Sequence, residues 1–311
     1  MVKWKHRHLL GVDNLSVDEI RYLLEKGNWY RDFLEQSPKG TTILQGYYLI
    51  NLFFEASTRT RTSFEMAAKL LGMEVVNFSI DISSVQKGES FRDTVRTLAR
   101  MKADALVVRH RSSGIPLYLS QFLPFHIINA GDGMREHPTQ ALLDLLTMKR
   151  AGIDFSQMTV AIVGDILHSR VARSLSIGLK KLGSRVILSG PPTLIPVGIE
   201  VLGAQVVYPV EEAMKRADIV YLLRIQKERQ EAGYFPSEKE YARFFGLKKN
   251  LLSHQGQLKM IMHPGPVNRG LEVASALVEG ENSFIEEQVT CGLAVRMAVL
   301  ETLIREGRSD G

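Results

Sequence analysis

One stretch organises the chain: residues 53–65 read Phe-Phe-Glu-Ala-Ser-Thr-Arg-Thr-Arg-Thr-Ser-Phe-Glu. The apolar, aromatic run 47–54 that leads into it predicts a buried strand. After it, apolar residues recur at helical spacing and predict a helix over 62–71. The polar segment Ser57–Thr60 therefore falls on a turn between a strand and a helix.

A turn of this kind favours the binding of an anion. The start of a helix presents backbone N–H groups that lack an intrahelical acceptor, together with the positive end of the helix dipole. Hydroxyl groups add donors, and an arginine fork matches a phosphate or carboxylate in a bidentate manner. We therefore predict an anion site at Ser57, Thr58, Arg59 and Thr60. In the alternative interpretation, Ser57 or Thr58 only caps the helix and the arginines are solvated.

The composition is that of a globular protein with room for two domains. The chain has 311 residues, of which 45% are apolar and 23% charged. No apolar run approaches the roughly 18 residues of a membrane span, and the first residues lack the apolar core of a signal peptide. The single cysteine, Cys291, excludes an internal disulfide framework and a cysteine-rich zinc site. We expect a cytoplasmic protein with no membrane partner.

The net charge of +5 does not indicate a nucleic-acid partner. Lysine and arginine are scattered among acidic residues, and no basic stripe interleaved with aromatic residues occurs. A modest positive excess also suits an enzyme whose substrates are anions.

Apolar runs alternate with helical patterns along the whole chain, which predicts an α/β protein with mainly parallel sheets. A first helix is expected after Ser16, where Ser-Val-Asp-Glu forms a capping box. Further strands are predicted at 74–78, 105–109, 126–129, 159–163, 185–188, 205–208, 219–223 and 259–262, and further helices at 91–101 and 138–150. The alternation restarts near residue 150. We therefore predict two domains, each a parallel sheet flanked by helices, over residues 1–149 and 150–287.

Several polar groups follow the predicted strands, where ligands bind in such sheets. Arg109 ends one strand, and His137-Pro138-Thr139-Gln140 begins a helix. In the second domain Arg170 begins a helix, and an Arg-x-Gln-Lys-Glu-Arg run covers 224–229. A His-Pro-Gly-Pro turn at 263–266 holds its carbonyl groups rigidly. Each motif alone has an ordinary alternative, such as a surface ion pair, a local hydrogen bond or a stiff turn.

Together and in this order, the motifs resemble those of the transcarbamoylase family over nearly the whole chain. The resemblance implies that the C-terminal helix, within 288–311, returns to the first domain. It implies that carbamoyl phosphate is bound by Ser57, Thr58, Arg59, Thr60, Arg109, His137, Gln140, Pro264 and Gly265. It implies that the second substrate is bound by Lys87, Arg170, Arg224 and Gln226, and that the catalytic residues are Arg59, Thr60, Lys87, Arg109 and His137.

The long polar loop 79–90 reads as a binding loop in this context. The resemblance implies that Lys87, and also Ser83, reach into the site of a neighbouring subunit, so that a homotrimer shares its active sites. On sequence alone, a solvated loop is the alternative.

Two features favour L-aspartate as the acceptor of the carbamoyl group. Ornithine-using members carry His-Cys-Leu-Pro where this chain has His-Pro-Gly-Pro, and they lack the Arg-x-Gln-Lys-Glu-Arg run. The implied products are N-carbamoyl-L-aspartate and phosphate, in de novo pyrimidine biosynthesis, with no cofactor and no metal. The alternatives are a transcarbamoylase for another amino acid such as ornithine, or a catalytically silent scaffold homologue. Association with a regulatory chain or a dihydroorotase stays open.

Overall fold

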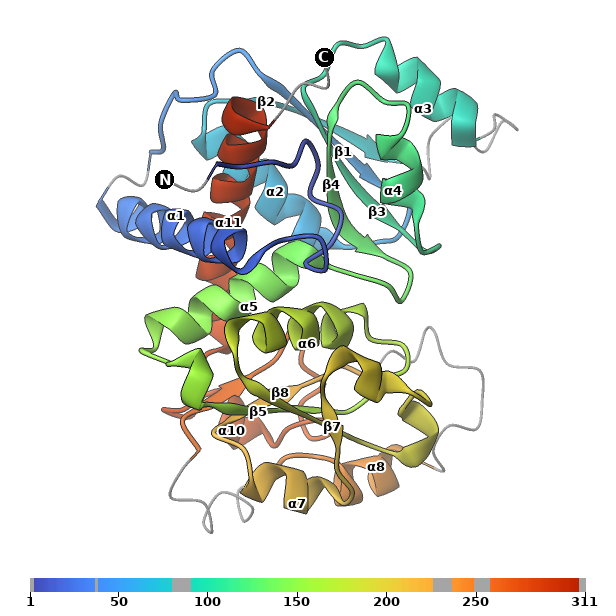
Figure 1. Cartoon of the computed structure of the whole chain (residues 1–311), viewed down its shortest axis with the longest axis vertical. Helices are drawn as coiled ribbons and strands as arrows, with labels where there is room; N and C mark the ends of the chain where they lie inside the picture. Colours follow the sequence, from blue (N-terminus) through green and yellow to red (C-terminus); the bar gives the residue numbers. More distant parts are fainter. Residues whose placement is uncertain (1–2, 37–38, 80–90, 226–236, 249–257, 308–311) are drawn as a thin grey trace. The chain divides into compact units, whose positions relative to one another are not determined.

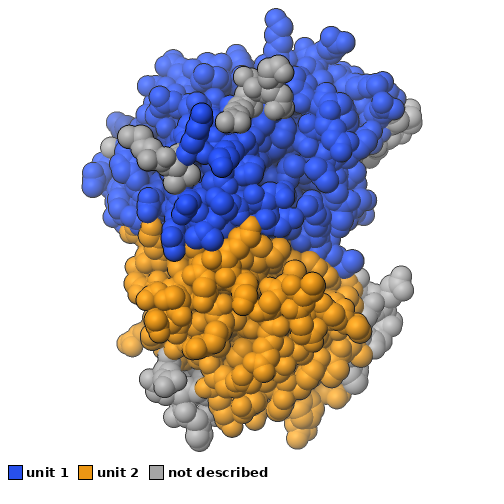
Figure 2. Space-filling view, in the orientation of Figure 1, with its two compact units in different colours: residues 1–146, 290–311 blue, residues 147–289 orange. Residues whose placement is uncertain are grey.

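Nine parallel strands form two separate sheets in the computed structural model, which describes residues 3–36, 39–79, 91–225, 237–248 and 258–307. The chain divides into a first unit, Met1–Leu146 with Thr290–Gly311, and a second unit, Thr147–Val289 (Figure 2). The boundary falls inside two helices, α5 and α11, and not in a linker. Each unit holds one sheet, so the predicted class of two parallel α/β domains is confirmed.

The sheet of the first unit has the strand order β2-β1-β3-β4, with every pair of neighbours parallel. In chain order the elements are α1 (Val17–Gln36), β1 (Tyr48–Phe53), α2 (Thr58–Leu70), β2 (Glu74–Ser79), α3 (Phe91–Ala99), β3 (Ala105–His110), α4 (Ile115–Ser120), β4 (His126–Asp132), α5 (Pro138–Arg150) and, from the end of the chain, α11 (Ile285–Glu306). Helices α3 and α4 cover one face of this sheet, and α2 and α11 lie on the other (Figure 1).

The sheet of the second unit has the order β7-β6-β5-β8-β9 and is also parallel throughout. Its elements are η3 (Phe155–Gln157), β5 (Thr159–Val163), α6 (Arg170–Leu182), β6 (Arg185–Ser189), η4 (Pro192–Leu194), η5 (Ile199–Leu202), β7 (Gln205–Val206), α7 (Val210–Lys215), β8 (Ile219–Leu222), α8 (Glu238–Phe244), β9 (Met260–Met262) and α10 (Ser275–Val278). Helix α6 covers one face, and α7 and α10 pack on the other (Figure 1).

The strands take their places because helices bury both faces of each sheet. All five residues of β5 are buried, and so is the run Leu106–Val108 in β3. Parallel strands covered on both faces read as continuous apolar runs, which is why the sequence located them. Fully burying one such leucine or isoleucine side chain stabilises the fold by about 1.5–3 kcal/mol.

Capping residues set where the helices begin. At α1 the Ser16 hydroxyl accepts a hydrogen bond from the Glu19 amide at 3.2 Å, and the Glu19 carboxylate accepts one from the Ser16 amide at 2.8 Å. This is the predicted capping box. At α6 the Ser169 hydroxyl accepts from the Ala172 amide at 3.1 Å, and Gly183 ends the helix with a φ of 99°.

Helix α11 returns to the first unit, as expected. The Tyr30 hydroxyl of α1 donates to Glu301 at 2.9 Å, and Lys26 of α1 contacts Glu306 at 2.9 Å. Burial, together with Glu301, raises the pKa of Tyr30, which keeps this hydroxyl protonated as a donor.

Several element bounds differ from the sequence prediction, and three of these differences are explained by the local sequence. Helix α2 begins at Thr58, whereas the sequence predicted residue 62. The prediction was late because the first turn is polar and carries no apolar periodicity. Helix α3 ends at Ala99, shortly before Lys102 adopts a positive φ of 54°. Strand β7 ends at Val206, just before the Tyr208-Pro209 pair.

Candidate active site

The carboxyl ends of β1, β3 and β4 form one edge of the first sheet. From β1 the chain crosses to β2 on one side and then returns to β3 on the other side of β1. The strand order therefore reverses between β1 and β3, which is where open parallel sheets bind ligands. The predicted residues Ser57–Thr60 follow β1, Arg109 lies at the end of β3, and His137 follows β4.

Ser57 occupies the N-cap position of α2, yet its side chain makes no capping hydrogen bond. Its backbone is extended, with φ −158° and ψ 87°, and its carbonyl accepts the first helical bond from Arg61 at 3.1 Å. Thr58 and Arg59 are exposed and Thr60 is buried. The interpretation in which Ser57 caps this helix is therefore wrong. Thr58, Arg59 and Thr60 form the first turn of the helix, whose N–H groups have no acceptor within the helix.

Arg109 is held at this edge by an ion pair. Its Nη2 donates to Glu55, which follows β1, at 2.7 Å, and its Nη1 donates to the carbonyl of Ala130 at 3.3 Å. Both side chains are largely buried, at 13% and 18% exposure. Because Phe53 and Arg109 are register partners in the sheet, the guanidinium is placed beside the start of α2. These two bonds orient the guanidinium before an anion binds.

His137 and Gln140 lie at the start of α5, where Pro138 is the first helical residue, as predicted. His137 is buried, and its carbonyl accepts from the Gln140 amide at 3.0 Å. The Gln140 side-chain nitrogen donates to the buried carboxylate of Asp144 at 3.0 Å. Since a carboxylate only accepts, this bond fixes which end of the Gln140 amide faces Asp144. The Gln140 oxygen is left as an acceptor, which suits contact with a carbamoyl NH₂ group.

A buried arginine, Arg296, lies near the first turns of both α2 and α5. Arg296 of α11 donates to the Ser63 hydroxyl of α2 at 3.1 Å, and its guanidinium lies 5.1 Å from the Phe64 ring centroid. Burial lowers the pKa of Arg296 to about 10, against the favourable charge of Asp144. Helices α2 and α5, which both begin at the predicted site, are thus linked to the C-terminal helix through one cation.

A set of buried polar side chains shapes the loop that precedes His137. Asp132 accepts from Asn129 at 2.8 Å, from the Glu136 amide at 3.2 Å and from the Gly114 amide at 2.7 Å. Glu136 in turn accepts from the Val12 amide at 2.9 Å. Sequence reasoning missed these residues. The signal was present in the acidic and amide residues that directly precede the His-Pro-Thr-Gln motif.

The second sheet repeats the arrangement at its own carboxyl edge. Its strand order reverses between β5 and β8, whose ends are paired by the bond from the Leu223 amide to the Val163 carbonyl at 2.8 Å. Arg170, buried, is the first residue of α6 after β5, and Arg224 lies two residues beyond the end of β8. Both predicted arginines therefore occupy the ligand-binding edge of the second unit.

The His-Pro-Gly-Pro turn follows β9, the neighbour of β8. Gly265 has a φ of 62°, a conformation that favours glycine, and its amide donates to His263 Nδ1 at 2.8 Å. The turn is thus fixed internally, in agreement with the predicted rigidity. Pro264 and Gly265 belong to the second unit, unlike the other residues predicted to contact carbamoyl phosphate.

Three predicted residues, Ser83, Lys87 and Gln226, lie outside the described residues. Their roles stay predictions. Within the described ranges, no group of three or more histidine, cysteine, aspartate or glutamate side chains is arranged to hold a metal ion. In that same part of the chain, no helix combines the length and apolar character needed to cross a membrane.

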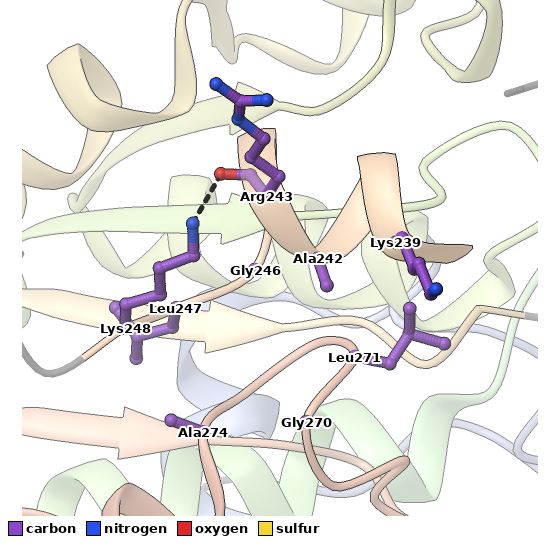
Figure 3. Close-up of a pocket in the computed structure, with 9 residues that line it drawn as sticks. All are labelled: Lys239, Ala242, Arg243, Gly246, Leu247, Lys248, Gly270, Leu271 and Ala274. Carbon is purple, nitrogen blue, oxygen red and sulfur yellow. Dashed lines mark hydrogen bonds between the residues drawn. The ribbon is translucent and has the colours of Figure 1, made fainter. Parts of the chain in front are cut away.

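The second unit also contains a pocket of about 230 Å³ (Figure 3). Its described lining residues are Lys239, Ala242, Arg243, Gly246, Leu247, Lys248, Gly270, Leu271 and Ala274. Lys248 donates to the carbonyl of Arg243 at 2.6 Å across its rim. None of these nine residues is a predicted substrate residue, although Ala242 and Leu271 pack in one cluster with Ile225, the residue after Arg224.

Comparison with known proteins identifies the family of the chain. The model of the aspartate/ornithine carbamoyltransferase carbamoyl-P binding domain matches residues 7–150, and the model of the Asp/Orn binding domain matches residues 156–303. A Rhizobium johnstonii protein named aspartate carbamoyltransferase catalytic subunit is 49% identical over 315 residues, covering 100% of this chain and 99% of the relative.

Solved structures show the same fold. The aspartate transcarbamoylase of Trypanosoma cruzi, in complex with carbamoyl phosphate and aspartate, has a TM-score of 0.84 at 29% identity and covers 95% of each chain. The ornithine carbamoyltransferase of Pyrococcus furiosus has a TM-score of 0.86 at 28% identity, covering 99% of this chain and 100% of that chain. Both domain models match in order, and the full-length relative is nearly half identical. The chain therefore belongs to the aspartate/ornithine carbamoyltransferase family.

Proposed function

We propose that this chain transfers the carbamoyl group of carbamoyl phosphate to the amine of L-aspartate, as the catalytic subunit of an aspartate carbamoyltransferase. One observation carries the proposal. The Ser57–Thr60 segment begins α2 beside Arg109 at the switch point of the first sheet, and the Ser57 hydroxyl is not used as a helix cap. Such an edge suits the phosphate group of carbamoyl phosphate. The products are N-carbamoyl-L-aspartate and phosphate, which the cell uses in de novo pyrimidine biosynthesis.

The reaction makes three demands on the site. The aspartate nitrogen forms a bond to the carbamoyl carbon, and the bond from that carbon to the phosphate oxygen breaks. The carbonyl oxygen becomes an oxyanion on the way and needs donors, which Thr60, Arg109 and His137 supply. The departing phosphate needs positive charge and hydrogen-bond donors, supplied by the start of α2 with Arg59 and by Lys87. The proton released by the amine passes to an oxygen of the departing phosphate.

The acceptor amino acid has to be held with its amine aimed at the carbon. Arg170 and Arg224, at the carboxyl edge of the second sheet, bind its carboxylates, and Gln226 and Lys87 assist. Gln140 accepts from the carbamoyl NH₂ group, in the orientation that Asp144 imposes. Pro264 and Gly265 offer rigid carbonyl acceptors to the same group.

Two arguments favour aspartate over ornithine. The chain has His-Pro-Gly-Pro at 263–266 and the Arg-x-Gln-Lys-Glu-Arg run at 224–229. A second carboxylate on the acceptor matches two arginines, whereas the ammonium group of ornithine would be repelled by them. The full-length relative from Rhizobium johnstonii is also named as an aspartate carbamoyltransferase.

A direct assay tests the proposal. The purified protein is incubated with carbamoyl phosphate and either L-aspartate or L-ornithine, and the carbamoylated product is identified by mass spectrometry. We expect a carbamoylated product with L-aspartate and none with L-ornithine. Product only with ornithine would assign the chain to the ornithine-using members, and absence of product with both acceptors would refute the proposal in favour of another acceptor or a silent scaffold.

We further propose that the active sites are shared in a homotrimer in the cytoplasm, through the loop that carries Lys87. Head-to-tail sharing requires a closed ring. Lys87→Ala and His137→Ala proteins should each be nearly inactive. After the two are dissociated, mixed in equal amounts and reassembled, about a quarter of sites combine unmutated halves, since one-half times one-half applies to random assortment. Activity should recover to roughly 25% of the parent on that assumption.

The control for this experiment is mixing without dissociation, which should restore nothing. If hybrids verified by mass spectrometry stay as inactive as their parents, Lys87 acts within its own chain and the shared site is refuted.

A further inference from the structure

Glu272 is a buried carboxylate in the second unit, and its side chain accepts hydrogen bonds from two segments of the chain. It lies between β9 and α10 and is 1% exposed. Its Oε1 accepts from the Ile225 amide at 2.9 Å and from the Asn268 side chain at 2.6 Å, and its Oε2 accepts from the Asn268 amide at 2.8 Å. Its own carbonyl accepts from the Leu247 amide at 2.9 Å, which fixes the residue in place.

These hydrogen bonds join two segments that sequence reasoning assigned to substrate. Ile225 stands between Arg224 and Gln226, immediately beyond β8. The last bond between β5 and this segment is the one made by the Leu223 amide, so the sheet no longer restrains the backbone at Ile225. Asn268 follows the rigid turn that contains Pro264 and Gly265. Just beyond Arg224, the backbone is therefore held by a hydrogen bond to the Glu272 carboxylate and no longer by hydrogen bonds to a neighbouring strand.

The surroundings explain why an acid is present in this apolar region. Burial raises the pKa of Glu272, although Ile225 and Asn268 stabilise its charged form. His263 lies close to this carboxylate. Its Nδ1 accepts from Gly265, so the neutral ring carries its proton on Nε2, which lies 3.9 Å from Glu272 Oε2. An apolar residue of this size would leave two buried backbone amides without an acceptor, which is costly.

We propose that Glu272 is a positioning residue for the acceptor amino acid, because it holds the backbone next to Arg224 so that the guanidinium meets a carboxylate. This inference rests on the proposed function. Glu272 itself does not contact substrate. It acts on the binding of the acceptor and leaves the carbamoyl phosphate residues of the first unit unchanged.

The decisive variant is Glu272→Gln. The side chain keeps its size but loses one acceptor oxygen, and its new NH₂ group faces either the Asn268 amide or the Ile225 amide. Loss of a hydrogen bond to a charged group corresponds to a change of about tenfold or more in a binding or rate constant. We expect the KM for L-aspartate to rise about tenfold, with a smaller fall in kcat. The inhibition constant of succinate, a dicarboxylate without the reacting amine, should rise in parallel, while the dissociation constant of carbamoyl phosphate stays within about twofold.

Glu279→Gln is the matched control. It makes the same chemical change a few residues away, at an exposed glutamate that pairs with Arg269 at 2.8 Å. This control should leave all three constants unchanged. If Glu272→Gln does not fold, Asn268→Ala replaces it. That variant removes only the bond from Asn268 Nδ2, and it should raise the aspartate KM by a smaller factor with carbamoyl phosphate binding intact.

The outcomes separate the two proposals. A parent protein that does not use aspartate refutes the proposed function before any variant is compared. If the parent uses aspartate and the variant keeps its aspartate KM within twofold, the role of Glu272 is refuted. An equal loss of carbamoyl phosphate affinity would also refute it, because the effect would then extend to the Pro264–Gly265 turn or to the whole unit and would not be specific for the acceptor.

Discussion

Replacing Ser57 by alanine separates the two roles that a serine can have at the start of a helix. A serine that caps a helix stabilises the fold, and its loss costs about 0.5–2 kcal/mol. Ser57 makes no such bond, although it occupies the N-cap position of α2. We therefore expect Ser57→Ala to change the free energy of unfolding by less than about 0.5 kcal/mol, the lower end of that range.

The expected effect on activity is much larger. If the hydroxyl donates to the phosphate of the substrate, its removal costs a hydrogen bond to a charged group, about 1.5–3 kcal/mol. At 1.36 kcal/mol for each factor of ten, this corresponds to a fall of roughly 10- to 150-fold in kcat/KM for carbamoyl phosphate. The measurement is phosphate release with L-aspartate held saturating.

Ser16→Ala is the control in the same unit. Ser16 does cap its helix, through the bond that its hydroxyl accepts from Glu19, and it lies outside the predicted site. Its loss should lower the free energy of unfolding by about 1 kcal/mol and leave kcat/KM unchanged. Unfolding can be followed by tryptophan fluorescence in urea, because both tryptophans, Trp4 and Trp29, belong to the first unit.

The reasoning would be refuted by the opposite pattern. If Ser57→Ala destabilises the first unit as much as Ser16→Ala does and keeps kcat/KM within twofold of the parent, Ser57 is a structural cap and the anion site is wrong.

Three further predictions concern other parts of the fold. Arg224→Ala should raise the KM for L-aspartate at least tenfold through loss of a charged contact, while calorimetry finds carbamoyl phosphate binding unchanged. Arg296→Met should lower the free energy of unfolding in urea by about 3 kcal/mol, because the buried carboxylate of Asp144 loses its counter-charge. The control Arg305→Met, at an exposed arginine, should lower it by at most about 1 kcal/mol. The Nδ1 of His126 donates to the Arg7 carbonyl, and burial lowers the pKa of His126 below its ordinary value of 6.5. Below pH 6.5 the unfolded chain therefore binds a proton at this residue more readily than the folded chain does. The free energy of unfolding should therefore fall as the pH drops through 6.5, and His126→Gln should flatten that part of the profile.

Much of the fold follows from local sequence signals. Pro138 marks the start of α5, and the predicted bounds of that helix and of β5 agree with the structure. These elements have strong signals because a proline suits the first helical turn and a doubly covered strand is apolar throughout. The start of α2 was misplaced because Thr58 to Thr62 are all polar, so the apolar pattern begins one turn late.

The residues assigned to substrate occur in short contiguous motifs that sequence reasoning can find, whereas the residues that support them do not. Asp144 and Glu272 each interact with a distant partner that no local pattern connects to them. Asp144 lies near Arg296 of α11, and the bond from Ile225 to Glu272 spans 47 residues. A weak signal does exist. Each of these acids interrupts an apolar run, Leu-Leu-Asp-Leu-Leu and Leu-Glu-Val, where a charge is expensive unless it has a partner.

The return of α11 to the first unit has a consequence for synthesis of the protein on the ribosome. Contacts between α1 and α11 join residues up to 284 positions apart, as in the bond between Tyr22 and Glu306. The first unit therefore stays incomplete while the whole second unit is made. The second unit is continuous in sequence and can complete its fold earlier, although domains usually fold in order from the N-terminus. A nascent chain halted before residue 285 would leave the apolar surface of α1 and α5 uncovered, which makes it a substrate for chaperones.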